Sequence, residues 1–176
     1  RLPAEEVTLA EALKTVPQHA YVTSFIGQWH LGPDETYWPE AQGFDTNVGG
    51  YSWGQPPSYF APYRIPTMVD GPEGEYLTDR HAADAEAFID ANREQPFMLY
   101  LSTYAVHTPL QAKAELVDKY RRKAETHPAE AQGNPVYAAM IESMDACVGR
   151  VIDKLEDVGV ADHTVIFFTD DNGGLI

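Results

Sequence analysis

A short, unbroken run of apolar residues at positions 97–102 constrains the fold of this chain more than any other feature. The run follows Pro96 and is shorter than an ordinary helix, so we predict a β-strand. A strand that is apolar at consecutive positions is typical of a parallel sheet, in which helices cover both faces. The run therefore predicts a strand that is buried on both sides.

Further strands and helices are expected on either side of this run. Residues 21–26 and 164–169 are rich in β-branched and aromatic residues, which predicts two more strands. Helices are expected over residues 8–14, 78–92, 113–123 and from 135 to the residue before Gly159, from capping residues and from apolar residues spaced three and four apart. Strands that alternate with helices predict an α/β fold with a mostly parallel sheet flanked by helices, in a single domain over residues 1–176.

The stretch from residue 27 to residue 74 has little periodicity and is rich in Gly, Pro, Tyr and Trp. A connection of this length is either functional or disordered. Its many aromatic residues argue against disorder, because disordered segments are poor in them. We therefore predict a packed excursion that faces the substrate.

Charge, apolar runs and cysteine content argue against some classes of partner and site. The formal net charge is −15, which argues against nucleic acid as a partner, because phosphate backbones need neutralising Lys and Arg. There is no apolar run of the length that spans a bilayer, and no signal peptide is visible. Cys147 is the single cysteine and falls in an apolar helical stripe, which favours a buried structural thiol over a nucleophile.

Polar side chains follow each of the three predicted strands. His30 follows the first strand, His107 follows the second, and Asp171 with Asn172 follows the third. In a parallel sheet these strand ends lie on one edge, where ligands bind. Asp and Asn offer the oxygen ligands that Ca²⁺ and Mg²⁺ prefer, although Asp-Asn-Gly-Gly is also good turn sequence.

Together these segments resemble the sulfatase family of the alkaline phosphatase superfamily. Five motifs occur in the order that the family has them. They are the lead-in at residues 2–10; G-Q-W-H-L-G at 27–32, which is similar to the family's G-K-W-H-L-G with Gln28 in place of Lys; G-F-D at 43–45; P-F-M-L-Y-L at 96–101 with H-T-P at 107–109, similar to P-F-F-L-Y-L and H-x-P; and F-T-D-D-N-G at 168–173, similar to F-T-S-D-N-G.

The resemblance implies a reaction and a role for each candidate residue. In this family a formylglycine, made from Cys or Ser, attacks the sulfur of a sulfate ester, and a divalent cation, usually Ca²⁺ rather than Mg²⁺, binds the sulfate. Asp171 and Asn172 are then metal ligands, His30 orients or deprotonates the formylglycine hydrate, and His107 contacts the sulfate and protonates the leaving oxygen. Gln28 is expected to contact the substrate.

Two departures from the family pattern affect these expectations. The Cys/Ser-x-Pro-x-Arg segment that carries the nucleophile is absent, and so is the Asp-Asp pair that ends the family's first strand and completes the metal site; we expect both upstream of Arg1. A downstream active-site Lys of the family is missing as well. The chain is thus expected to be a partial catalytic domain that is inactive alone. Gln28 replaces a charged Lys, which predicts a weakened or re-tuned enzyme.

Three functions remain open at this point. The leading one is a sulfuric ester hydrolase acting on a sulfated small molecule or glycan, for which the aromatics between Tyr37 and Tyr63 are candidate stacking surfaces. The second is a phosphoester or phosphonate hydrolase of the same superfamily, and the third is a catalytically silent ligand-binding relative, suggested by Gln28. By family resemblance we expect a periplasmic or extracellular location; the sequence does not indicate the oligomeric state.

Overall fold

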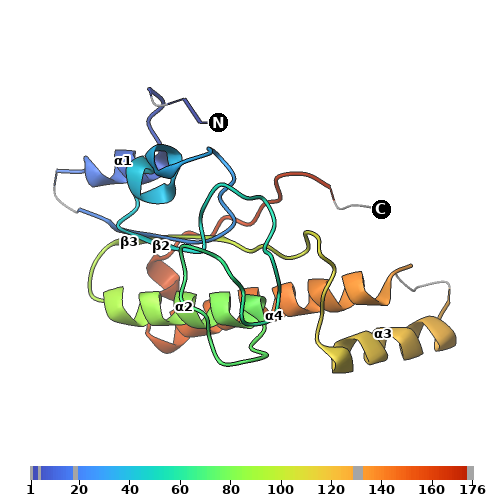
Figure 1. Cartoon of the computed structure of the whole chain (residues 1–176). Helices are drawn as coiled ribbons and strands as arrows, with labels where there is room; N and C mark the ends of the chain where they lie inside the picture. Colours follow the sequence, from blue (N-terminus) through green and yellow to red (C-terminus); the bar gives the residue numbers. More distant parts are fainter. Residues whose placement is uncertain (1, 4, 18–19, 129–132, 174–176) are drawn as a thin grey trace.

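The computed structural model describes residues 2–3, 5–17, 20–128 and 133–173. Within these ranges the chain forms a three-stranded sheet of order β2-β1-β3 in which both neighbouring pairs are parallel (Figure 1). The strands are β1 (Val22–Gly27), β2 (Thr46–Val48) and β3 (Phe97–Ser102). The predicted α/β fold with a parallel sheet is therefore confirmed.

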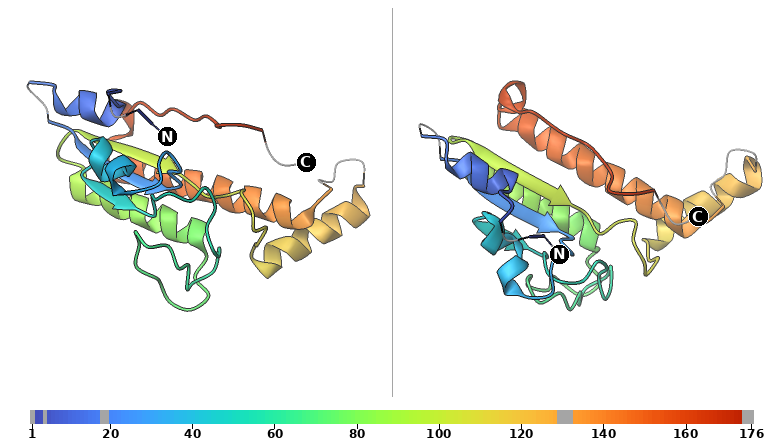
Figure 2. Two further views of the ribbon diagram at one scale, coloured as in Figure 1. Left: turned by 45° about the horizontal axis from the view of Figure 1, so that its top comes forward. Right: turned by 90° about the horizontal axis from the view of Figure 1, so that it is seen from above.

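Four α-helices accompany the sheet, each beginning within one residue of its predicted start. They are α1 (Leu9–Lys14), α2 (Leu77–Asn92), α3 (Ala114–Thr126) and α4 (Pro135–Asp157), with short 3-10 helices η1 (Glu35–Tyr37), η2 (Pro39–Gln42) and η3 (Ala161–His163). Helix α2 packs against β1 and β3, α4 lies along α2, α3 packs on α4, and α1 lies on the other side of the sheet (Figure 2). Among the described residues no helix is both long and apolar enough to cross a membrane.

Capping side chains fix where two of these helices begin. Thr8 accepts a hydrogen bond from the backbone N–H of Glu11, whose carboxylate accepts one from the N–H of Thr8. Asn134 caps α4 by accepting from the N–H groups of Val136 and Tyr137. Each cap satisfies donors that the first helical turn leaves free, which is worth about 1 kcal/mol.

We predicted that β3 is buried on both faces, but in the structure β1 is the strand that is buried on both faces. Five of the six residues of β1 are buried, whereas those of β3 are only partly buried and Tyr100 is exposed. The prediction was wrong because β3 lies at an edge of the three-stranded sheet, where it has β1 as its one neighbour. An apolar run shows that a strand is suited to burial, but the position of that strand in the sheet decides the outcome.

The predicted third strand at residues 164–169 is not formed, and this prediction too was wrong. The segment is extended but pairs with no strand of the described chain, and Figure 2 shows it as a thread apart from the sheet. Its apolar side chains at Val165, Ile166, Phe167 and Phe168 are all exposed. Strand-forming residues favour an extended backbone, but only a neighbouring strand can complete the hydrogen bonds of a sheet.

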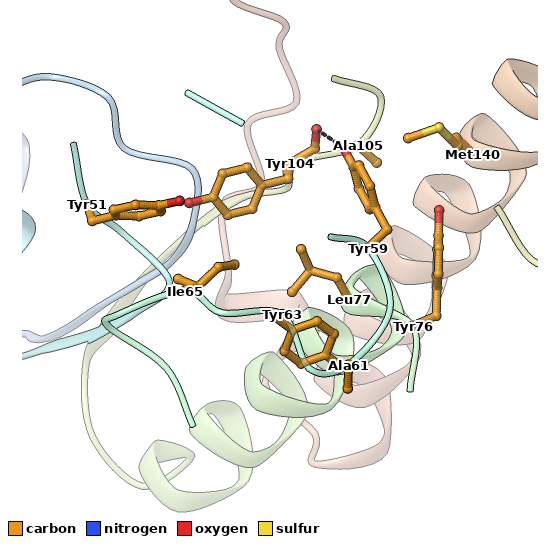
Figure 3. Close-up of a cluster of buried hydrophobic side chains, with 10 residues drawn as sticks. All are labelled: Tyr51, Tyr59, Ala61, Tyr63, Ile65, Tyr76, Leu77, Tyr104, Ala105 and Met140. Carbon is orange, nitrogen blue, oxygen red and sulfur yellow. Dashed lines mark hydrogen bonds between the residues drawn. The ribbon is translucent and has the colours of Figure 1, made fainter. Parts of the chain in front are cut away.

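The stretch from residue 27 to residue 74 packs largely through buried tyrosines, which confirms that it is an ordered excursion. Its core lies where the excursion meets the loop after β3 and the start of α2 (Figure 3). The buried members of this cluster are Tyr51, Tyr59, Ala61, Tyr63, Ile65, Tyr76, Leu77, Tyr104, Ala105 and Met140. Because the excursion is tied to the loop that follows β3, it can position groups at the carboxyl edge of the sheet.

Candidate active site

His30 lies just beyond the carboxyl end of β1. The strand ends at Gly27, which has a φ of 111° and lies so close to β3 that a Cβ there would overlap the carbonyl oxygen of Ser102. The next residue, Gln28, donates its backbone N–H to that oxygen at 2.7 Å. His30 itself has a left-handed φ of 57°, and its N–H donates to the carbonyl of Tyr51 at 3.1 Å. The turn thus places an exposed imidazole at the sheet edge.

His107 lies beyond the carboxyl end of β3 and is held by a buried tyrosine. The side chain of Tyr59 is 0% exposed, and its hydroxyl donates to the carbonyl oxygen of Tyr104 at 2.5 Å (Figure 3). The same hydroxyl lies 2.9 Å from the carbonyl oxygen of His107, to which it also donates. The Nδ1 atom of His107 lies 3.2 Å from both the carbonyl oxygen and the hydroxyl of Thr108. These contacts occupy Nδ1 and leave Nε2 as the ring nitrogen for a ligand.

The two histidines line one cavity of about 500 Å³. Its other lining residues are Ser52, Trp53, Gly54 and Gln55, all from the excursion. The prediction that the loops after the first two strands converge on one edge is consistent with this arrangement, because β1 and β3 are parallel neighbours. A cavity of this size suits a small organic ligand.

Gly54 and Tyr51 shape the wall of this cavity. A Cβ on Gly54 would overlap the imidazole of His30, so only glycine leaves room for the ring in this position. Trp53 packs on the buried ring of Tyr51, with ring centroids 5.9 Å apart and planes inclined by 35°. Trp53 belongs to the aromatics that the sequence offers as candidate stacking surfaces, whereas Ser52, Gly54 and Gln55 carry no periodicity or motif that would mark them as lining a site.

Gln28, Asp171 and Asn172 do not line the cavity. Gln28 is half-buried beside the end of β1, while Asp171 and Asn172 lie exposed in a bend after the unpaired segment. Asn172 donates through its side-chain amide to the carbonyl of Gly173. In the described part of the chain, no three or more His, Cys, Asp and Glu side chains cluster as a metal site. The assignment of Asp171 and Asn172 as metal ligands therefore stays a prediction.

The buried ionisable groups near the core are unsuited to nucleophilic chemistry. Cys147 is buried, as predicted, and desolvation raises the pKa of its thiol to about 11. Desolvation likewise raises the pKa of Tyr51 to about 12, while its hydroxyl donates to the carbonyl of Gln55 at 3.4 Å. Both groups therefore stay protonated at neutral pH and act as packing elements.

Known proteins of similar sequence cover the whole of this arrangement. The profile described as Sulfatase matches residues 1–176. Arylsulfatase G of Mus musculus is 31% identical over 98% of this chain and 36% of its own length, and N-acetylgalactosamine-6-sulfatase of Homo sapiens is 29% identical over 99% and 34%. The chain thus spans about a third of the length of these curated relatives.

Solved structures give the same result for the fold. The crystal structure of Ps i-CgsB matches with a TM-score of 0.68 and 26% identity, over 89% of this chain and 38% of that protein. Its complex with k-i-k-neocarrahexaose matches with a TM-score of 0.63 over the same shares. The parallel sheet and its flanking helices thereby define an α/β fold of the alkaline phosphatase-like class.

Within that class the sequence match decides the family. The Sulfatase profile extends over the full chain, and the relatives that match nearly all of it are named as sulfatases. The chain belongs to the sulfatase family.

Proposed function

We propose that this protein is a metal-dependent sulfuric ester hydrolase that acts on a sulfated carbohydrate. The observation that carries the proposal is the convergence of His30 and His107 in one cavity, in a chain that matches the sulfatase family from residue 1 to residue 176. Among the relatives, one is named for its action on N-acetylgalactosamine 6-sulfate groups and another was solved with a neocarrahexaose, which supports a sugar substrate. A periplasmic or extracellular location is part of the proposal.

Each histidine has a role that follows from its surroundings. His107 lines the cavity and its Nδ1 is held by Thr108, which leaves Nε2 for a ligand, so the residue is suited to contact the sulfate and to protonate the leaving oxygen. His30 has an exposed ring that is fixed by its backbone turn and by Gly54, so it is suited to hold the proton of the attacking hydroxyl. That hydroxyl belongs to a formylglycine in the family, and we expect it from outside this chain.

Asp171 and Asn172 fit part of a Ca²⁺ site, with Mg²⁺ as the second choice. A carboxylate and an amide offer oxygen donors, and both residues are exposed. Ca²⁺ takes six to eight oxygens, so these two residues would hold it only with further ligands. When bound, the cation neutralises negative charge on the sulfate.

The experiment compares sulfate and phosphate ester hydrolysis by the intact protein, meaning the full-length protein of which this chain is expected to be a part. We expect turnover of 4-nitrophenyl sulfate in Ca²⁺-containing buffer, and a fall in kcat of about 10²- to 10⁴-fold for His30→Ala and His107→Ala. His163→Ala, at an exposed histidine outside the cavity, serves as the matched control and should keep the wild-type rate. Equal rates for all three variants would contradict the assigned roles.

Two alternatives are decided by the same assay. Preference for 4-nitrophenyl phosphate over the sulfate would favour a phosphoester or phosphonate hydrolase of the same superfamily. A folded, metal-loaded protein that turns over neither ester would favour a silent ligand-binding relative, which the replacement of Lys by Gln28 suggests.

A further inference from the structure

One aromatic residue of the excursion differs from all the others. Trp53 is 58% exposed and lines the cavity that holds His30 and His107. The remaining aromatics from Tyr37 to Tyr63 are buried or half-buried, and none of them lines this cavity. They are Tyr37, Trp38, Phe44, Tyr51, Tyr59, Phe60 and Tyr63. The broad set of candidate stacking residues therefore reduces to one.

The indole of Trp53 is supported from behind and open in front. The ring of Tyr51, which is buried, packs against it at 5.9 Å. The next residue, Gly54, has no side chain to cover the ring and leaves His30 close by. A large apolar surface left open to solvent on a cavity wall is a binding surface for an apolar face of a ligand.

Polar groups on the same cavity wall indicate which other chemical groups the ligand carries. Gln55 is exposed, and its Oε1 accepts a weak hydrogen bond from the Thr108 hydroxyl at 3.4 Å, which leaves its Nε2 to donate to a ligand. The six lining residues include no carboxylate, although the chain carries 27 acidic residues. The wall thus accepts an anionic group beside hydroxyl-bearing and apolar surfaces.

We propose that Trp53 and Gln55 form a sugar subsite of this cavity, in which a pyranose ring stacks its C–H face on the indole and a hydroxyl accepts from the Gln55 amide. The sulfate of the same sugar then lies between His30 and His107. This inference rests on the proposed sulfatase function and adds the residues that select a sugar. A plain aryl sulfate stacks on Trp53 but has no hydroxyl for Gln55, so the two residues have separable effects.

The test uses the intact protein with two kinds of substrate. The first is whichever of galactose 6-sulfate, N-acetylgalactosamine 6-sulfate and glucose 6-sulfate it cleaves fastest, and the second is 4-nitrophenyl sulfate. Trp53→Ala should raise KM about tenfold or more for both substrates and leave kcat within about twofold, and Trp53→Phe should retain most of the affinity. Gln55→Ala should raise KM severalfold for the sugar sulfate alone.

Matched controls separate these effects from general damage. Val69→Ala replaces another exposed apolar residue of the excursion, and Gln95→Ala replaces a glutamine outside the cavity, so both should keep the wild-type KM. Unchanged KM values in Trp53→Ala, or equal effects of Gln55→Ala on both substrates, would overturn the proposal.

A binding measurement keeps the subsite testable if no sulfate ester is cleaved. At least one of galactose 6-sulfate, N-acetylgalactosamine 6-sulfate and glucose 6-sulfate should change the tryptophan fluorescence of the wild-type protein, and the change should vanish in Trp53→Phe, whose Trp29 and Trp38 remain. If no sulfate ester is turned over but this fluorescence change is seen, the hydrolase function is overturned and the sugar subsite is supported. Absence of the fluorescence change with all three sugar sulfates would overturn the subsite.

Discussion

His30 owes its position to two backbone features that act together. Its φ of 57° lies in the left-handed region, which is uncommon for a residue with a side chain and is found at functional sites. The missing side chain of Gly54 leaves the space that the imidazole needs. The motif G-x-W-H-L-G marks this histidine in the sequence, but the space beside it comes from a residue 24 positions further along.

Gln28 is the residue at which this chain departs from the family signature. Gln28→Lys in the intact protein should raise kcat/KM for 4-nitrophenyl sulfate about tenfold, because a hydrogen bond to a charged group is worth about 1–2 kcal/mol more than a neutral one. The side chain of Gln28 is half-exposed, so a charge there does not have to be buried. Gln28→Met, which adds no charge, is the matched control. An unchanged or lower rate in Gln28→Lys would indicate that Gln28 serves another substrate geometry.

The burial of His81 on α2 leads us to predict that the folded protein loses stability in acid. It is 0% exposed, and both ring nitrogens lack a hydrogen-bond partner within the described structure. Burial, with the charge of Arg80 adding to it, lowers the pKa of His81 from 6.5 to about 3. A depressed histidine pKa means that the unfolded chain binds the proton more tightly, so stability is full above pH 6.5 and falls as the pH drops toward 3.

Urea unfolding of the intact protein at pH 7.5 and pH 5 tests the predicted effect of His81 on stability. Between pH 7.5 and pH 5 the free energy of unfolding of the wild-type protein should fall by about 2 kcal/mol more than that of His81→Leu. Lowering the pH by about 1.5 units below the unfolded-state pKa of 6.5 corresponds to a free energy of that size. His163→Leu, at an exposed histidine, should behave as wild type. Parallel losses in wild type and His81→Leu would show that His81 is not responsible.

At the scale of elements, the parallel pairing of β1 and β3 brings the site together. The register runs from Val22 opposite Phe97 to Gly27 opposite Ser102, so both strands end at the same level. His30 and His107 follow these ends by three and five residues. The buried hydroxyl of Tyr59 then ties the loop of His107 to the excursion. Strand pairing therefore sets the edge, and the excursion sets the wall of the cavity.

The exposed apolar side chains of residues 164–169 lead to a prediction about dye binding by this chain. Phe167 is 88% exposed, and Val165, Ile166 and Phe168 are exposed beside it, which is a large apolar surface to leave in water. The 176-residue chain should therefore bind the dye ANS, and the double variant Val165→Lys with Phe167→Lys should lower the bound fluorescence by about half. Leu31→Lys, at an exposed apolar residue elsewhere, is the control. Equal dye binding by wild type and the double variant would refute this account.

At the scale of the whole molecule, charge and metal binding have to be considered together. The net charge of −15 repels an anionic substrate, so attraction must come from local groups at the site. None of the described residues that line the cavity is acidic, which removes local repulsion, and a bound cation would add attraction. Asp171 and Asn172 supply too few ligands for this, and the described chain holds no other cluster that could bind a metal.

The 176-residue chain on its own should therefore bind Ca²⁺ no more tightly than about millimolar and should not hydrolyse 4-nitrophenyl sulfate. Calorimetric titration with Ca²⁺ and a sulfate-release assay check the two parts, with the intact protein measured beside the chain. Sulfate-ester turnover by the isolated chain would refute the prediction.

The sequence by itself determined the features that depend on neighbouring residues. Caps at Thr8 and Asn134, apolar spacing in the helices, and the apolar runs of β1 and β3 are local signals, because each acts within a few positions along the chain. The motifs after the two strands marked His30 and His107 in the same way. The family followed from the order of such motifs.

Only the tertiary structure decided which residues meet. It placed β1 inside and β3 at an edge, left residues 164–169 unpaired, set Gly54 against His30, and left Trp53 as the exposed aromatic of the excursion at the cavity. Sheet pairing, side-chain burial and close backbone approach all depend on segments far apart in the sequence. A local pattern shows what a segment is suited for, and the partner that folding brings to it determines what it becomes.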